Sequence, residues 1–175
     1  GVVLADLGLN IPSYKSSERT FNLITQAIGR AGRLQKPGEA IIQTYLPNNY
    51  VIYYSSIQHY NRFFNEDMGY RKLSQNPPYV YLILVTLLSK NEDELIDSSY
   101  FIKNYLVSKC ANKKVEIIGP SEPFLSKING RYQRKILIKY KSRGDIDDMI
   151  HELIDTVNHR KNLEIKINVD PESEY

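Results

Sequence analysis

Two arginines three residues apart stand in the segment TQAIGRAGR, and each of them follows a glycine. Helical geometry would place Gln26, Arg30 and Arg33 on one face of a helix, with Phe21 and Ile24 on the opposite face. Glycine costs about 1 kcal/mol in a helix relative to alanine, but it lets a ligand come close to the backbone. A guanidinium is a permanently charged planar fork that suits phosphate. The pattern therefore indicates a phosphate-binding face, with a merely solvated basic helix surface as the alternative.

The chain has no phosphate-cradling loop of its own, because no G-x-x-x-x-G-K-[ST] segment occurs. A phosphate that meets the two arginines must then be held by another part of the protein. The single cysteine, Cys110, excludes an internal disulfide or a cysteine metal cluster and is typical of a reducing cytoplasm. The three histidines have no convincing ligand partners at metal-binding spacing, so we expect no metal site.

A second group of charges lies in residues 109–143, a segment that contains ten Lys and Arg residues but only two carboxylates. Alternation in a strand over 131–141 puts four cations on one pleat face and Ile136, Ile138 and Tyr140 on the other. Phosphates pair with such cations, while unpaired bases stack on neighbouring tyrosines. Solubilising lysines are the alternative interpretation. The candidates for DNA or partner binding are Arg131, Arg134, Lys135, Lys139, Lys141 and Arg143.

The first part of the chain has the pattern of one βαβ unit, which needs neighbours to bury both faces of its sheet. Strands are expected at about 2–6 and 39–45, with a helix over 17–31 between them. Apolar residues then recur at helical spacing over 50–73 and predict a helical stripe: Tyr53, Ile57, Tyr60, Phe64 and Met68.

Pro77-Pro78 ends any helix and marks a domain boundary. The rest of the chain has the order βαββαβ, which is the ferredoxin-like arrangement. The expected elements are strand 79–88, helix 91–110, strand 114–119, strand 131–141, helix 145–159 and strand 162–169. The predicted fold class is thus α/β followed by α+β.

Composition agrees with a globular chain: 175 residues, 42% hydrophobic and 25% charged, with a net charge of +3. No run of 18 apolar residues occurs, which excludes a membrane-spanning helix, and the first residues do not resemble a secretory signal. Because Gly1 begins directly with a buried-strand pattern, we expect the chain to be a piece of a longer protein.

QAIGRAGR at 26–33 resembles motif VI of superfamily 2 helicases. Further segments resemble the PriA family of primosomal replication-restart helicases in the same order along nearly the whole chain. These segments are LADLGL at 4–9, GEAIIQTYLP at 38–47, NPPY at 76–79, IGP at 118–120, GRY at 130–132 and VDP at 169–171.

The resemblance implies that residues 1–49 are the C-terminal part of the second RecA-like helicase lobe. Residues 50–78 would be a helical connector, and 79–175 a ferredoxin-like domain similar to ribosomal protein S10. Arg30 and Arg33 would act as arginine fingers on the γ-phosphate of ATP, and Gln26 would help to couple the lobes. ATP and Mg²⁺ would bind in the full-length protein, zinc would bind in an upstream insertion, and this piece alone would be inactive and bind none of them.

The family resemblance also implies a function: a 3′–5′ DNA helicase that recognises stalled or branched forks and initiates primosome assembly in the bacterial cytoplasm, at the nucleoid. Its partners would be branched and single-stranded DNA, the single-stranded DNA-binding protein, other primosome proteins and the N-terminal lobe of the same chain. Arg143 aligns near the pocket proposed for the acidic tail of the single-stranded DNA-binding protein. The alternative is a free-standing ferredoxin-like module that binds nucleic acid or protein without motor activity.

Overall fold

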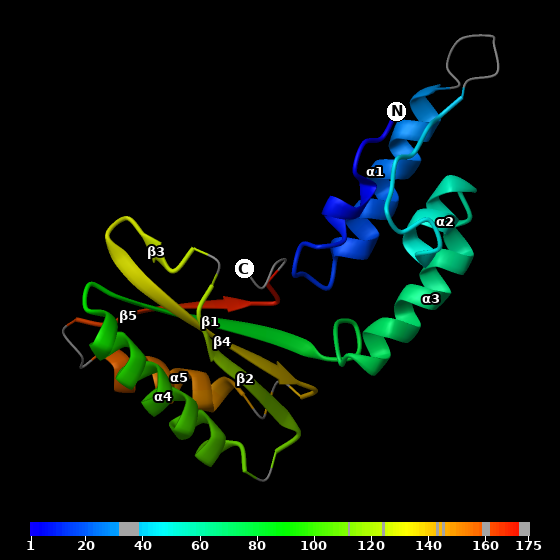
Figure 1. Ribbon diagram of the computed structural model, residues 1–175. Helices are drawn as coiled ribbons and strands as arrows, with labels where there is room; N and C mark the ends of the chain where they lie inside the picture. Colours follow the sequence, from blue (N-terminus) through cyan, green and yellow to red (C-terminus); the bar gives the residue numbers. More distant parts are fainter. Residues whose placement is uncertain are drawn as a thin grey trace. The chain divides into compact units, whose positions relative to one another are not determined.

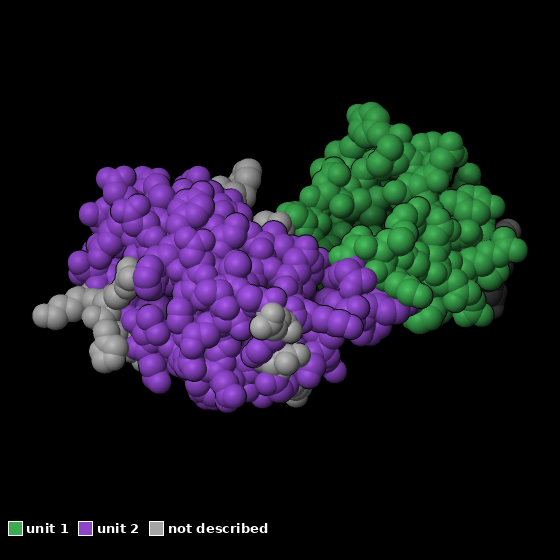
Figure 2. All heavy atoms as spheres, turned by 90° about the horizontal axis from the view of Figure 1, so that it is seen from below, with its two compact units in different colours: residues 1–74 green, residues 75–175 purple. Residues whose placement is uncertain are grey.

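The computed structural model describes residues 1–31, 39–111, 113–123, 125–142, 144, 146–158 and 162–171. They form a mixed α/β structure that divides into two compact units, residues 1–74 and residues 75–175 (Figure 2). Each unit has its own apolar clusters, so each is described separately.

Unit 1 consists of a 3₁₀ turn and three helices. These are η1 (Ala5–Gly8), α1 (Ser16–Ala31), α2 (Tyr50–Ser56) and α3 (Tyr60–Leu73) (Figure 1). Ile24 of α1 packs with Ala5 and Ile52, and Phe21 stacks on Phe63 with ring centroids 4.2 Å apart. One face of α1 is therefore the core of this unit.

The two strands expected in unit 1 are reduced to one parallel bridge between Val2 and Ile42, so that part of the prediction was wrong. Leu4 adopts φ 53°, which ends the extended run, and the chain then enters the 3₁₀ turn. The Asp6 carboxylate accepts hydrogen bonds from the Thr44 hydroxyl and from the Tyr45 backbone N–H at 2.8 Å. These bonds lower the pKa of Asp6 and tie the two segments together where a ladder was expected.

The helical pattern predicted over 50–73 is confirmed, but it forms two helices, and most of its apolar stripe is exposed. Tyr53, Ile57, Tyr60 and Phe64 are 45–55% exposed. The reason is a break between α2 and α3, where Gln58 has a positive φ of 52°. Because two helices replace one, their buried faces follow different registers, and the buried apolar positions are Val51, Ile52 and Phe63.

Unit 2 is an antiparallel sheet with two helices on one of its faces (Figure 1). The strands lie in the order β2-β4-β1-β5, and β3 pairs with β4. The elements are β1 (Tyr81–Ser89), α4 (Glu92–Lys109), β2 (Val115–Ser121), β3 (Lys127–Ile128), β4 (Arg131–Tyr140), α5 (Asp147–Asn158) and β5 (Glu164–Val169). The predicted order of strands and helices is confirmed, apart from the additional β3.

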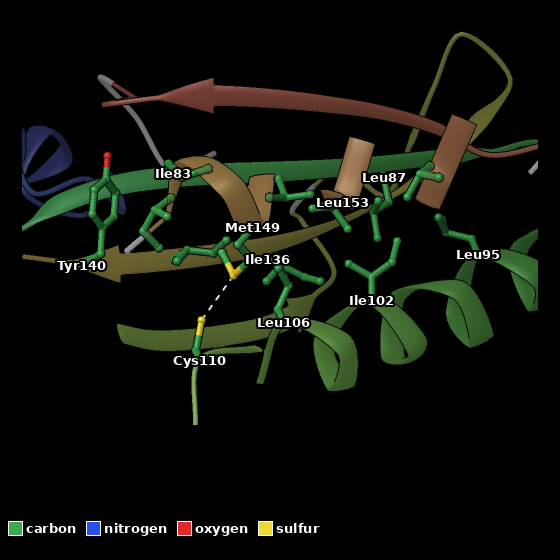
Figure 3. Close-up of a cluster of buried hydrophobic side chains, with 14 residues drawn as sticks. Ile83, Leu87, Leu95, Ile102, Leu106, Cys110, Ile136, Tyr140, Met149 and Leu153 are labelled. Atoms are coloured by element: carbon green, nitrogen blue, oxygen red, sulfur yellow. Dashed lines mark hydrogen bonds between the residues drawn. The ribbon is translucent and has the colours of Figure 1, made fainter. Parts of the chain in front are cut away.

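The core of unit 2 lies between the sheet and the two helices (Figure 3). Val85 and Ile136, from neighbouring strands, and Leu106 of α4 are completely buried. Cys110 lies in the same core, where its thiol contacts the Met149 sulfur at 3.2 Å. Asn91 caps α4 by accepting a hydrogen bond from the Glu94 N–H at 3.3 Å, as its position before the acidic first turn predicts.

Candidate functional site

Helix α1 presents a polar face opposite its apolar one. Gln26 and Arg30 are exposed on it, whereas Phe21 and Ile24 are 3% and 1% exposed. The separation of the two faces is what the sequence pattern predicts. Arg33 and the glycine before it lie outside the described residues. Arg30 is therefore the member of the predicted arginine pair whose position is known.

Buried charges connect α1 to α3. The Arg71 guanidinium donates to the Asp67 carboxylate at 2.7 Å and to Glu18 of α1 at 3.0 Å. The Tyr50 hydroxyl donates to the other Asp67 oxygen at 2.9 Å. Burial raises the pKa of Tyr50, and the Asp67 carboxylate raises it further, so the hydroxyl stays a donor. These contacts hold the first turns of the helix that carries Arg30.

The second candidate surface is the face of the unit 2 sheet that carries no helix. Cross-strand pairing places Lys135 of β4 beside Thr86 of β1, which in turn pairs with Lys166 of β5. Burial lowers the pKa of Lys135, because its ammonium group is partly removed from water.

Apolar residues share this face with the cations. Leu84 and Leu137 pair across β1 and β4 and are 7% and 8% exposed. The segment before β3 lies against the Gln133 end of this face, because the Ser126 carbonyl accepts a hydrogen bond from the Gln133 N–H at 2.8 Å and the Leu125 carbonyl accepts one from its side chain. The helix-free face is thus partly covered by the chain itself.

Of the six basic residues predicted to bind DNA or partners, Arg131, Lys135 and Lys139 share the helix-free pleat face of β4, as the alternation predicts. Arg131 makes an ion pair with Glu164, and Lys139 donates to the Asn76 side chain at 3.1 Å. Arg134 falls on the alternate pleat face from Lys135. Lys141 is exposed just after β4, and Arg143 lies outside the described residues.

Several partners were missed in the sequence because they come from distant segments. Glu164 of β5 reaches Arg131 through an ion pair, and Asn76, which precedes β1, accepts a hydrogen bond from Lys139. Lys166 lies opposite Thr86 of the intervening strand β1, and no local pattern reveals these neighbours. The hairpin between β3 and β4 did have a signal: Asn129-Gly130, both with positive φ, is the preferred two-residue turn.

Two further findings limit the chemistry of the described residues. Among them, no group of three or more His, Cys, Asp or Glu side chains could hold a metal ion. In the same part of the chain, no helix has the length and apolar character needed to cross a membrane.

Known proteins resemble this chain in sequence. A family model described as "Primosomal protein N C-terminal domain" matches residues 72–172. Replication restart protein PriA of Bacillus subtilis is 34% identical over 174 residues, which is 98% of this chain and 22% of that protein. PriA of Synechocystis is 40% identical over 142 residues, or 81% of this chain and 17% of that protein. PriA of Rickettsia prowazekii is 31% identical over 175 residues, which is 100% of this chain and 26% of that protein.

The chain thus spans about a quarter or less of the length of these relatives. Among solved structures, "De novo designed protein Foldit4" has a TM-score of 0.40 and 12% identity, over 53% of this chain and 97% of that one. A likeness at that level says nothing about function.

Proposed function

Because this chain belongs to the PriA family of replication restart proteins, we propose that it is the part of an ATP-dependent 3′–5′ DNA helicase that follows the nucleotide-binding lobe. The full protein would recognise stalled or branched forks and start primosome assembly in the cytoplasm. The observation that carries this proposal is the exposed Gln26 and Arg30 face of α1, supported from behind by a buried apolar face.

The residues of α1 fit a nucleotide held by another part of the protein. A Cβ added at Gly29 would have no described heavy atom within 4 Å, so the surface beside Arg30 is open. Bound ATP would supply the phosphoryl group, and Arg30, with Arg33, would stabilise the negative charge that spreads over it during transfer. Gln26, one turn before Arg30, would sense the same ligand.

The residues of this chain fit the zinc expected in the full protein less well than they fit ATP. A zinc cluster needs several thiolates, and the one cysteine is buried beside Met149. Zinc is therefore assigned to residues outside this chain, and Mg²⁺ would bind together with ATP in the full-length protein.

For unit 2 we propose a ferredoxin-like domain. The order β1-α4-β2-β4-α5-β5 and the sheet order β2-β4-β1-β5 support this assignment. The helix-free face, with Lys135 and Lys166, would contact branched or single-stranded DNA through its phosphates. The single-stranded DNA-binding protein and other primosome proteins would be the protein partners of the full molecule.

The experiment that tests this function uses the 175-residue chain itself. We expect no DNA-stimulated ATP hydrolysis, because the chain has no P-loop, together with weak DNA binding that falls as salt is raised. We also expect Lys135→Gln to weaken binding, while Lys72→Gln, on α3 of unit 1, serves as the matched control. Turnover by the chain alone, or affinity independent of salt, would contradict the proposal.

A further inference from the structure

Helix α4 carries large apolar side chains on two faces. Its inner face packs against the sheet through residues such as Leu95 and Leu106, which are 1% and 0% exposed (Figure 3). On its outer face Tyr100 is 50% exposed, Phe101 46% and Val107 48%. A helix that covers a sheet needs one apolar stripe, so the packing of unit 2 does not account for the second one.

Helical geometry gathers these outer side chains with two carboxylates. At about 100° per residue, Asp93, Asp97, Tyr100 and Val107 fall within about 80° of one another around the helix axis, and Phe101 borders them. All five residues are exposed. Together they form one continuous surface along α4, which we call the α4 outer face.

The carboxylates of the α4 outer face are not compensated within the protein. In the part of the chain that the structure describes, the side chains of Asp93 and Asp97 have no hydrogen-bond or ion-pair partner. Glu152 of the neighbouring helix, by contrast, pairs with Lys109 and accepts a hydrogen bond from the Tyr105 hydroxyl at 2.8 Å. A carboxylate in the first turn, such as Asp93, complements the helix dipole, but Asp97 lies beyond that turn.

The sign of this charge decides which partner chemistry fits. Phosphates of DNA and acidic peptides would be repelled by Asp93 and Asp97, so the α4 outer face does not suit the anionic partners of the basic surface. Exposed aromatic side chains are typical of the centre of protein–protein interfaces. Tyr100 and Val107 are two helical turns apart, which is the spacing at which a second helix presents its own apolar stripe.

We propose that the α4 outer face docks an amphipathic helix of a partner protein. The apolar stripe of that helix covers Tyr100, Phe101 and Val107, and its Lys or Arg side chains pair with Asp93 and Asp97. The inference is independent of the proposed ATP and DNA chemistry, because it uses neither α1 nor the helix-free face of the sheet. It gives unit 2 a protein-docking surface whose charge is opposite to that of the basic face.

The test uses a synthetic probe with the inferred chemistry. The probe is a fluorescein-labelled peptide of about 18 residues, long enough to form a helix, with Leu at i, i+3, i+4 and i+7 and Lys at polar positions near one end. Its twin carries Glu in place of every Lys. Fluorescence anisotropy measures the binding of both peptides to the 175-residue chain at low and at high salt.

We expect the Lys peptide to bind at least about tenfold more tightly than its Glu twin at low salt. Asp93→Asn with Asp97→Asn weakens binding of the Lys peptide about fivefold at low salt and less at high salt, because salt screens exposed ion pairs. The matched control is Asp147→Asn with Asp148→Asn, which removes the same charge from the exposed first turn of α5 and keeps the original affinity.

A second pair of variants tests the apolar part of the face. Tyr100→Ser with Val107→Ser is expected to weaken binding at least about tenfold at both salt concentrations, because apolar contacts are not screened. Leu125→Ser with Ile128→Ser, which changes exposed apolar residues near β3, is the control and leaves binding unchanged. Circular dichroism verifies that all variants are folded.

Several results would overturn the proposal, and each points to a different conclusion. Equal binding of the two peptides, or equal losses in the Asp93/Asp97 variant and its control, removes the charge complementarity. Binding by the 175-residue chain but not by the full-length protein shows that the rest of the polypeptide covers the face. Dimerisation of the chain that Tyr100→Ser with Val107→Ser abolishes, measured by sedimentation, makes the occupant a second copy.

Discussion

The residue with the most unusual environment in unit 1 is Arg71. Its side chain is 10% exposed, and it bonds to a 5% exposed Asp67 as well as to Glu18. The sequence did not reveal this pair, because charged residues on a helix are usually solvated. Contacts from distant segments enclose it: Tyr50 of α2 donates to Asp67, and the Tyr14 ring lies 5.4 Å from the Arg71 guanidinium.

We predict that Arg71→Met destabilises the chain by about 3 kcal/mol or more, because Asp67 is left as a buried charge without its cationic partner. Urea-induced unfolding measures the loss. Lys72→Met, one residue along on the exposed side of α3, is the control and is expected to change stability by about 0.5 kcal/mol at most. A loss below about 1 kcal/mol for Arg71→Met would show that the buried pair does not hold α1 in place.

At the scale of elements, local patterns predicted α1 and the βαββαβ order well, because helical and strand periodicity are properties of a short segment. In unit 1 the same local patterns predicted two short strands, but only a bridge is present among its described residues. A bridge such as Val2–Ile42 becomes a ladder only when neighbouring strands are present, and the described part of unit 1 supplies none. Likewise, strand register decides that Val115 at the start of β2 lies opposite Tyr140 at the end of β4.

Two glycines of unit 2 allow a prediction about its turns. Gly130 has φ 76° in the β3–β4 hairpin, and no described heavy atom lies within 4 Å of a Cβ added there. Gly119 has φ 105°, and an added Cβ would lie 2.7 Å from the Lys135 carbonyl oxygen. We therefore expect Gly130→Ala to lower the free energy of unfolding by about 1 kcal/mol, the cost of an alanine at positive φ. We expect Gly119→Ala to lower it by clearly more, because the added Cβ also collides with the Lys135 carbonyl oxygen.

Chemical denaturation of the two glycine variants gives the comparison directly. Each is compared with the other, because the substitution is the same and both φ angles are positive, while the space around the Cβ and the value of φ differ. Equal losses would mean that the irregularity between Ile118 and Ser121 adapts to the added methyl group.

At the scale of the whole molecule, the chain joins a helical unit with an exposed arginine face to a sheet domain with a basic helix-free face and an acidic outer face on α4. The family model covers the second unit and the end of α3, and relatives match both units. Sequence reasoning could reach the family through QAIGRAGR and the collinear segments. Alternation correctly placed Arg131, Lys135 and Lys139 on one pleat face of β4, but it could not reveal the ion pair of Arg131 with Glu164, which comes from a distant strand.

The central claim is that Arg30 acts on a nucleotide held by another part of the protein. The most direct measurement is DNA-stimulated ATP hydrolysis by the full-length protein carrying Arg30→Ala, compared with Asn22→Ala on the same exposed face. We predict that kcat falls by about 10³ in the arginine variant, with ATP affinity within about threefold of the original and the asparagine variant unaffected. Normal turnover with Arg30→Ala would contradict the account.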